Sequence, residues 1–144
     1  MLTTRSIEAW SRLMQVSRAM TTIVDEDLKA AGFPSAIWYE VLLALSQAGP
    51  AGLRPYAMRQ KLMIPQYTVS RLMDRMEAAG VVERVPCAED GRGQILRARD
   101  AGLELLDDMW PVYRDAIAAR LEGRIDAAAL AQFGETLERL TPDD

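Results

Sequence analysis

The chain has 144 residues, of which 49% are apolar and 26% are charged, and its formal net charge of −4 is that of an ordinary globular domain. It has neither a run of roughly 20 apolar residues nor a signal peptide's apolar block, so we expect a cytoplasmic protein with no membrane partner. Histidine is absent and Cys87 is the only cysteine. Ser-His-Asp or Cys-His catalysis and an internal disulfide are therefore excluded, and we expect neither an enzyme function nor a cofactor or metal site.

Residues 6–31 are predicted to form a long amphipathic helix. Apolar side chains recur there at three- and four-residue steps, the period of a helix with one buried face. Gly32-Phe33-Pro34 interrupts the pattern, and Ser35 is positioned as the N-cap of a second helix. This second helix is expected to end at Gly49-Pro50.

A helix-turn-helix is predicted between Pro55 and Gly80. Pro55 suits the first turn of a short third helix, where its missing N–H is not needed. After a tight turn at Met63-Ile64, residues 65–79 are expected to form a fourth helix that stops at Gly80, a left-handed C-terminal cap. Two helices joined by such a short turn are typical of a helix-turn-helix.

Beyond Gly80 the apolar pattern becomes that of strands. Residues 81–85 and 94–98 are β-prone, and Asp90-Gly91 lies between them. Asp-Gly between two such runs predicts a hairpin, because glycine tolerates the positive φ of a tight turn. A hairpin that directly follows the second helix of a helix-turn-helix is a wing.

The charge of this middle segment differs from that of the rest of the chain. Residues 51–102 hold nine Lys and Arg against six Asp and Glu, a net charge of +3. The remaining residues hold eight against fifteen, a net charge of −7. A basic middle between acidic ends suits a nucleic-acid-binding module.

Two more helices are predicted after the hairpin. Asp100 is positioned to cap a fifth helix, in which Pro111 should cause a kink or a brief break near residues 107–111. Asp126 is positioned to cap the last helix. The apolar stripe of that helix consists of Leu130, Phe133, Leu137 and Leu140.

The predicted fold is mainly α-helical with a small β-hairpin wing. Residues 1–144 are expected to form one domain, in which a winged helix-turn-helix at 35–102 lies between dimerisation helices at 1–34 and 103–144. The apolar stripes of the first and last helices exceed what a small winged domain can cover, so we expect a homodimer. The alternative is that these helices pack on each other within a monomer.

This order of elements, together with three sequence strings, resembles the MarR family of bacterial transcriptional regulators. Residues 38–45, WYEVLLAL, are similar to the family's second helix. Residues 69–82, VSRLMDRMEAAGVV, are similar to its recognition helix and first wing strand. Asp90-Gly91-Arg92-Gly93, followed by Leu96 and Gly102, resembles its wing and the glycine that opens the next helix.

The resemblance implies a homodimer that binds a pseudo-palindromic operator on double-stranded DNA, usually as a repressor. The chain departs from the family pattern at two positions. Arg59 stands where the family often has a small alanine, so the third helix is expected to pack more loosely. Arg99 stands where the family usually has a threonine that caps the fifth helix, which leaves the capping role to Asp100. The rival interpretation is a winged-helix module that binds another protein instead of DNA.

The first turns of the fourth helix carry side chains suited to a major groove. Gln66 can bond adenine, Thr68 can contact a thymine methyl group, and Arg71 can bind guanine or a phosphate. Arg92 at the wing tip is expected to enter the minor groove, oriented by Asp90. The candidate DNA contacts are Arg54, Gln66, Tyr67, Thr68, Ser70, Arg71, Arg75, Asp90 and Arg92, with Lys61 as a further phosphate contact.

The resemblance also implies a cleft between the dimer helices and the winged domain that binds a small aromatic or phenolic effector. An aromatic and apolar set is suited to line it. This candidate set is Trp10, Met14, Trp38, Tyr39, Trp110 and Tyr113.

Alternatives remain open for several of these residues. The polar set on the fourth helix is also compatible with a plain solvated helix face. Arg75 is equally suited to an ion pair with Asp74, which would contribute little to stability. The aromatic set is equally compatible with ordinary core and interface packing.

Cys87 raises the question of redox sensing. We expect none, because the chain has no second thiol and Val85, Pro86 and Ala88 place no cation beside Cys87 in sequence. DNA binding should therefore be insensitive to peroxide.

Overall fold

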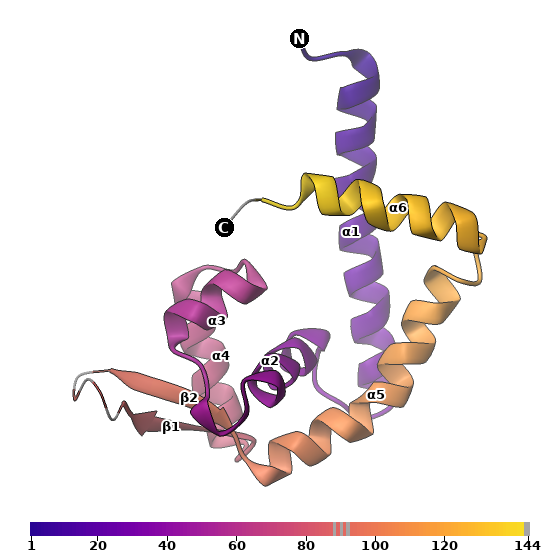
Figure 1. Cartoon of the computed structure of the whole chain (residues 1–144). Helices are drawn as coiled ribbons and strands as arrows, with labels where there is room; N and C mark the ends of the chain where they lie inside the picture. The colour runs from indigo at the N-terminus through magenta and orange to yellow at the C-terminus, as the bar shows by residue number, and fades with distance from the viewer. Residues whose placement is uncertain (88, 90, 92, 143–144) are drawn as a thin grey trace.

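The computed structural model describes residues 1–87, 89, 91 and 93–142. Its helices and strands follow one another in the order expected of a winged helix-turn-helix with flanking helices (Figure 1). They are α1 (Thr4–Ala30), α2 (Ala36–Ala48), the short 3-10 helix η1 (Gly49–Ala51), α3 (Pro55–Leu62), α4 (Gln66–Ala78), β1 (Val82–Pro86), β2 (Gln94–Ala98), α5 (Asp100–Arg120) and α6 (Ala127–Leu140).

The core forms where α2, α4 and α5 meet the base of the hairpin. The α4 sequence places apolar residues at i, i+3, i+4 and i+7, which gives one buried face. Burial of these side chains, at about 25 cal/mol per Å² of apolar surface, is the main force that holds the elements together. The fully buried large side chains are Leu28, Leu42, Leu45, Met58, Met73, Met76 and Leu96, together with Met109 from α5.

The hairpin is attached to the helices by its backbone. β1 and β2 pair antiparallel, with Val82 opposite Ala98 and Val85 opposite Ile95. Leu53, between η1 and α3, pairs with Leu96 on β2 through two backbone hydrogen bonds of 2.9 and 2.7 Å. These bonds connect the wing directly to the start of the helix-turn-helix.

The turn between α4 and β1 confirms the predicted role of Gly80. Gly80 has a φ of +76°, the left-handed conformation that glycine adopts without a steric penalty. The Val81 amide then donates to the Met76 carbonyl at 3.1 Å. The chain can therefore leave α4 and enter β1 within a few residues.

The start of α2 corrects one prediction. Ser35 occupies the N-cap position, but its side chain makes no capping hydrogen bond to the described residues. Instead the Ala36 amide donates to the Asp25 carboxylate at 2.8 Å, across the turn from α1. Since Asp25 is eleven residues away in sequence, the capping residue could not be found from local pattern.

Replacing Asp25 with alanine is therefore expected to lower the free energy of unfolding by about 1 kcal/mol, the typical cost of a lost N-cap. Ser35→Ala serves as the matched control and should change it by less than about 0.5 kcal/mol, the usual range for a surface position. Urea unfolding at a fixed protein concentration measures both values. A Ser35→Ala cost equal to or larger than that of Asp25→Ala would contradict this assignment.

α5 corrects one further prediction and narrows another. Arg99, not Asp100, occupies the N-cap position, and Asp100 is the first helical residue. The sequence predicts a kink or a brief break near Pro111. The helix continues through Pro111 to Arg120, which excludes the break, and Figure 1 shows the helix bending along its length. Met109 and Ala116 are buried on either side of Pro111, and this packing holds both halves of the helix in place.

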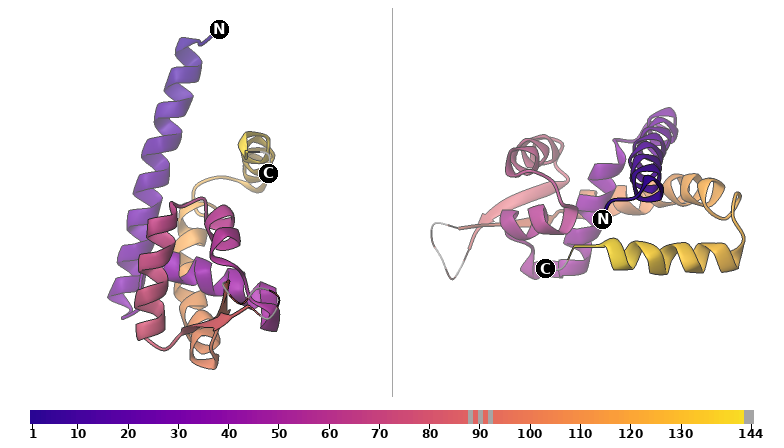
Figure 2. Two further views of the ribbon diagram at one scale, coloured as in Figure 1. Left: turned by 90° about the vertical axis from the view of Figure 1, so that its left-hand side faces the viewer. Right: turned by 90° about the horizontal axis from the view of Figure 1, so that it is seen from above.

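α6 and the N-terminal half of α1 project from the rest of the chain. The Asp126 side chain accepts from the Ala129 amide at 2.8 Å, which confirms the predicted cap of α6. No α6 residue is buried within the described part of the chain. α6 crosses α1 in Figure 1 but lies apart from it in both views of Figure 2.

Candidate nucleic-acid interface and cavity

The outer face of α4 carries most of the predicted DNA contacts. Val69, Leu72, Met73 and Met76 are buried on its inner face. Met63, in the left-handed conformation with φ +53°, ends α3 and turns the chain into α4. Of the predicted contacts on α4, Gln66, Tyr67, Ser70, Arg71 and Arg75 are exposed, and Thr68 is half-buried.

Two arginines on the helix-turn-helix lie against exposed tyrosine rings. The Arg71 guanidinium carbon lies 5.9 Å from the centre of the Tyr67 ring, and that of Arg59 lies 5.0 Å from the Tyr56 ring. Such cation–π contacts contribute about 0.5–1 kcal/mol at exposed sites and restrict the guanidinium orientation. Arg71 and Tyr67 therefore form one contact pair on the first turns of α4.

Arg84 on β1 joins the wing to α4 and was not predicted as a site residue. Its Nη2 donates to the Asp74 carboxylate at 2.8 Å and its Nη1 to the Glu77 carboxylate at 3.3 Å. The Arg84 backbone amide donates to the same Glu77 carboxylate at 3.2 Å. Asp74 and Glu77 lie three residues apart on α4, so they share one side of the helix. This spacing is the sequence signal by which a site for a basic side chain could have been found.

This arrangement changes the interpretation of Arg75. Asp74 pairs with Arg84, so the alternative of an Asp74–Arg75 ion pair is wrong. Arg75 is exposed and makes no ion pair with any described residue. Its side chain is available for a phosphate.

The base of the wing places Arg54 beside the cysteine. Arg54 Nη2 donates to Cys87 Sγ at 3.2 Å, and Cys87 is buried. The two residues are 33 positions apart in sequence, so a search for cations adjacent to Cys87 missed this contact. The predicted wing residues Asp90 and Arg92 lie outside the described residues.

The predicted effector residues do not gather at one place. Tyr39 is buried, and its ring stacks on Tyr113 with centroids 4.5 Å apart and on Trp110 at 6.1 Å. Trp38 is half-buried against the core, and Met14 is half-buried on α1. Trp10 is 65% exposed on the projecting half of α1.

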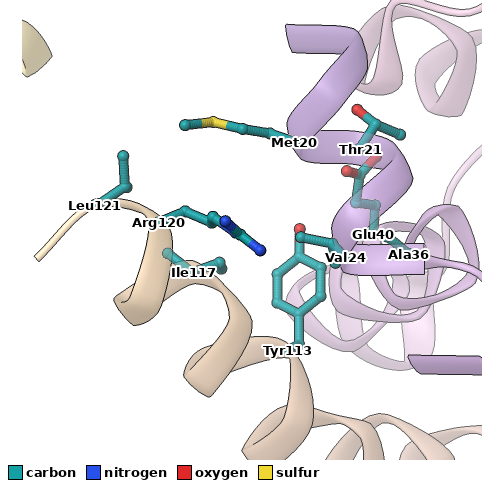
Figure 3. Close-up of a pocket in the computed structure, with 9 residues that line it drawn as sticks. All are labelled: Met20, Thr21, Val24, Ala36, Glu40, Tyr113, Ile117, Arg120 and Leu121. Carbon is teal, nitrogen blue, oxygen red and sulfur yellow. The ribbon is translucent and has the colours of Figure 1, made fainter. Parts of the chain in front are cut away.

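A cavity of about 210 Å³ opens between α1, α2 and α5 (Figure 3). Tyr113 is the one predicted effector residue that lines it; sequence reasoning looked for aromatic rings and missed two charged residues, Glu40 and Arg120. Burial raises the pKa of Glu40, and the neighbouring Asp25 carboxylate raises it further. The lining consists of Met20, Thr21, Val24, Ala36, Glu40, Tyr113, Ile117, Arg120 and Leu121.

Comparison with known proteins finds a family model that matches part of the chain. The MarR family model matches residues 31–93, from the end of α1 through the helix-turn-helix and β1. The matched part, which is less than half of the chain, is similar to the MarR family. No curated protein matches the chain in sequence.

Solved structures of MarR-family transcriptional regulators share the fold over nearly the whole chain. Sco3205 from Streptomyces coelicolor, solved in complex with DNA, has a TM-score of 0.86 at 24% identity and covers 100% of this chain and 93% of its own. A mutant of MarR from E. coli, complexed with operator DNA, has a TM-score of 0.83 at 21% identity over 99% of this chain and 100% of its own. BpsR from Bordetella bronchiseptica, whose DNA binding is regulated by 6-hydroxynicotinic acid, has a TM-score of 0.83 at 18% identity, with 93% of each chain covered.

These comparisons confirm the predicted fold, a mainly helical winged helix-turn-helix with a two-stranded hairpin. Residues 31–93 are thus similar in sequence to the MarR family, and nearly the whole chain has the fold of MarR-family transcriptional regulators. None of the helices in the described ranges is long and apolar enough to cross a bilayer.

Proposed function

We propose that this protein is a MarR-family transcriptional regulator that binds a pseudo-palindromic DNA operator as a homodimer in the cytoplasm and represses transcription until a small effector releases it. The observation that carries the proposal is the outer face of α4, where exposed Gln66, Tyr67, Ser70 and Arg71 lie opposite a fully apolar inner face. Relatives with this fold have been solved with DNA bound. A surface for a protein partner would instead carry an apolar or acidic exposed face.

In this proposal the residues divide between base reading and positioning. Gln66, Thr68 and Arg71 face base edges in the major groove, with Tyr67 supporting the Arg71 guanidinium. The second group, which contacts phosphates or the minor groove, consists of Arg54, Ser70, Arg75, Asp90 and Arg92. Arg54 also hydrogen-bonds Cys87, so it would act from a fixed place at the base of the wing.

The second subunit is proposed to cover α6 and the projecting half of α1. Ile7, Trp10 and Val16 on α1 are between 46% and 65% exposed, and Phe133 and Leu140 on α6 are 41% and 63% exposed. Large apolar side chains gathered on two projecting helices indicate an interface rather than a solvated surface. A homodimer would place its two recognition helices about one turn of DNA, ~34 Å, apart.

The proposed effector site is the cavity between α1, α2 and α5. Its walls are formed by α1 and α5, which flank the winged region, and by α2, the first helix of that region. A ligand there would contact both the flanking helices and the winged region, and the relative position of these two parts sets the spacing of the recognition helices in a dimer. The DNA binding of BpsR is regulated by a small planar molecule. The stacked Tyr39, Trp110 and Tyr113 rings form the aromatic wall beside this site.

Selection from a pool of random duplex DNA tests the proposal with the full chain. We expect an enriched inverted repeat bound by one dimer, with an affinity that falls as salt rises because phosphate contacts release counterions. No enriched sequence, with weak binding to all duplexes, would reject operator binding in favour of the protein-partner alternative.

Replacing Arg71 with alanine tests the recognition helix itself. We expect binding to the selected operator to weaken by about tenfold or more, because a bidentate base contact contributes about 1–3 kcal/mol, together with lower discrimination at one position of each half-site. Lys29→Ala, which removes one positive charge at the end of α1, is the matched control and should leave affinity within about twofold. Equal losses in the two variants would point to a nonspecific charge effect and contradict base reading by Arg71.

A further inference from the structure

Two side chains of opposite charge line the same cavity without pairing with each other. Glu40 enters it from α2 and Arg120 from the last turn of α5. Both are half-buried, and neither is hydrogen-bonded or ion-paired to any residue that the structure describes. A half-buried charge without a partner is costly, so such a pair of side chains is suited to a ligand that supplies both partners.

The two charges lie on different sides of the cavity. Figure 3 shows the Arg120 guanidinium extending from the α5 side, the Glu40 carboxylate on the α2 side near Thr21, and the Tyr113 hydroxyl between them. The remaining wall is apolar. It is formed by Met20, Val24, Ala36, Ile117 and Leu121.

The Glu40 side of the cavity is the acidic one. Asp25 adds a second carboxylate there, which already accepts the Ala36 amide. Burial and this neighbour raise the pKa of Glu40, and a cationic group placed against Glu40 would oppose this shift by attracting the charged carboxylate. An aromatic acid without a cationic group would satisfy Arg120 and leave Glu40 without a partner.

We propose that this cavity selects a small amphoteric molecule, with an ammonium group bound by Glu40, a carboxylate bound by Arg120 and an apolar body against the helix walls. The inference rests on the proposed effector function of the cavity and names the class of ligand. The volume of about 210 Å³ is below the roughly 300–1,000 Å³ of sites for drug-sized ligands, which indicates a molecule of about amino-acid size.

Matched ligands that differ in one charged group test this proposal on the full chain. The probes are tryptophan, tryptamine, which lacks the carboxylate, and indole-3-propionate, which lacks the amine. A second set of phenylalanine, phenethylamine and 3-phenylpropionate varies the size of the ring. In titration calorimetry, at least one amphoteric member is expected to bind about tenfold or more tightly than both of its single-charge analogues, because each charged group contributes its own paired contact.

Two variants assign each charged group to its residue. Glu40→Gln is expected to weaken binding of the amphoteric ligand to the level of the corresponding acid, and Arg120→Gln to the level of the corresponding amine. Glu104→Gln and Arg124→Gln, at exposed positions that do not line the cavity, are the matched controls and should bind as the wild type does. Circular dichroism verifies that each variant is folded.

Two results would overturn the proposal. In one, a single-charge analogue binds as tightly as its amphoteric counterpart, which would make the cavity a site for simple aromatic acids or simple amines. In the other, no member of either set binds. Operator binding measured separately distinguishes these results from a failure of the proposed function, since a chain that binds its operator but none of these ligands remains a DNA-binding regulator.

Discussion

Phe133→Glu is expected to convert the proposed dimer into folded monomers and to weaken operator binding by about 10²-fold or more. Phe133 is 41% exposed on α6, and no α6 residue is buried within the described chain, so a glutamate there removes no core packing. In a dimer the same position would place a charge within an apolar interface, which is strongly unfavourable. Each monomer would then bind a single half-site. The increase in affinity of about 10²–10⁴-fold that comes from linking two binding modules would be lost.

Sedimentation measures the oligomeric state of this variant, and a salt-controlled titration with the selected operator measures its affinity. Ala128→Glu is the matched control, because it adds the same charge to α6 on the face opposite Leu130, Phe133 and Leu137. The control should remain dimeric with unchanged affinity. A Phe133→Glu protein that sediments as a dimer would place the interface elsewhere.

Gly102→Ala is expected to lower the free energy of unfolding by about 2 kcal/mol, within the range for overpacking a close contact. A Cβ at Gly102 would overlap the Val81 carbonyl oxygen and lie 3.0 Å from Leu42 Cδ2. The Val81 carbonyl cannot move freely, because it accepts the Arg99 amide at 3.0 Å where α5 starts. The methyl group would therefore push α5 away from the end of α4 and loosen the connection between the winged region and α5.

Thermal and urea unfolding at a fixed protein concentration measure this change, and a loss of this size should lower the Tm by several degrees. Gly134→Ala is the control, since a Cβ there has no described atom within 4 Å. Because alanine favours a helix by up to about 1 kcal/mol over glycine, the control should be neutral or stabilising. Gly102→Ala with wild-type stability would show that the contact with Val81 relaxes at no cost.

The sequence was sufficient for the fold because the signals that specify its elements are local. Helical spacing of apolar residues predicted α1 and α4, and β2 begins and ends as expected. Gly80 and Asp126 were recognised because their roles depend on backbone conformation or on a residue three positions away. Ser35 does occupy the N-cap position of α2, but the Asp25 carboxylate accepts the Ala36 amide in place of the Ser35 hydroxyl. The N-cap of α5 lies one residue before the predicted Asp100.

The contacts that build the candidate sites could not be predicted in the same way. Arg84 reaches Asp74 and Glu77 because the chain reverses between α4 and β1, and Arg54 reaches Cys87 because the wing folds back on the start of α3. The predicted effector residues lie on α1, α2 and α5, the helices that form the cavity, yet Tyr113 alone among them lines it.

The sequence by itself determined the order of the elements, the apolar inner face and polar outer face of α4, and the exposed stripe of α6, since each depends on residues within a few positions of one another. The tertiary structure alone decided that Glu40 and Arg120 share one cavity, where neither side chain pairs with a residue that the structure describes. They are separated by most of the chain, and only the packing of α2 against α5 brings them to the same space.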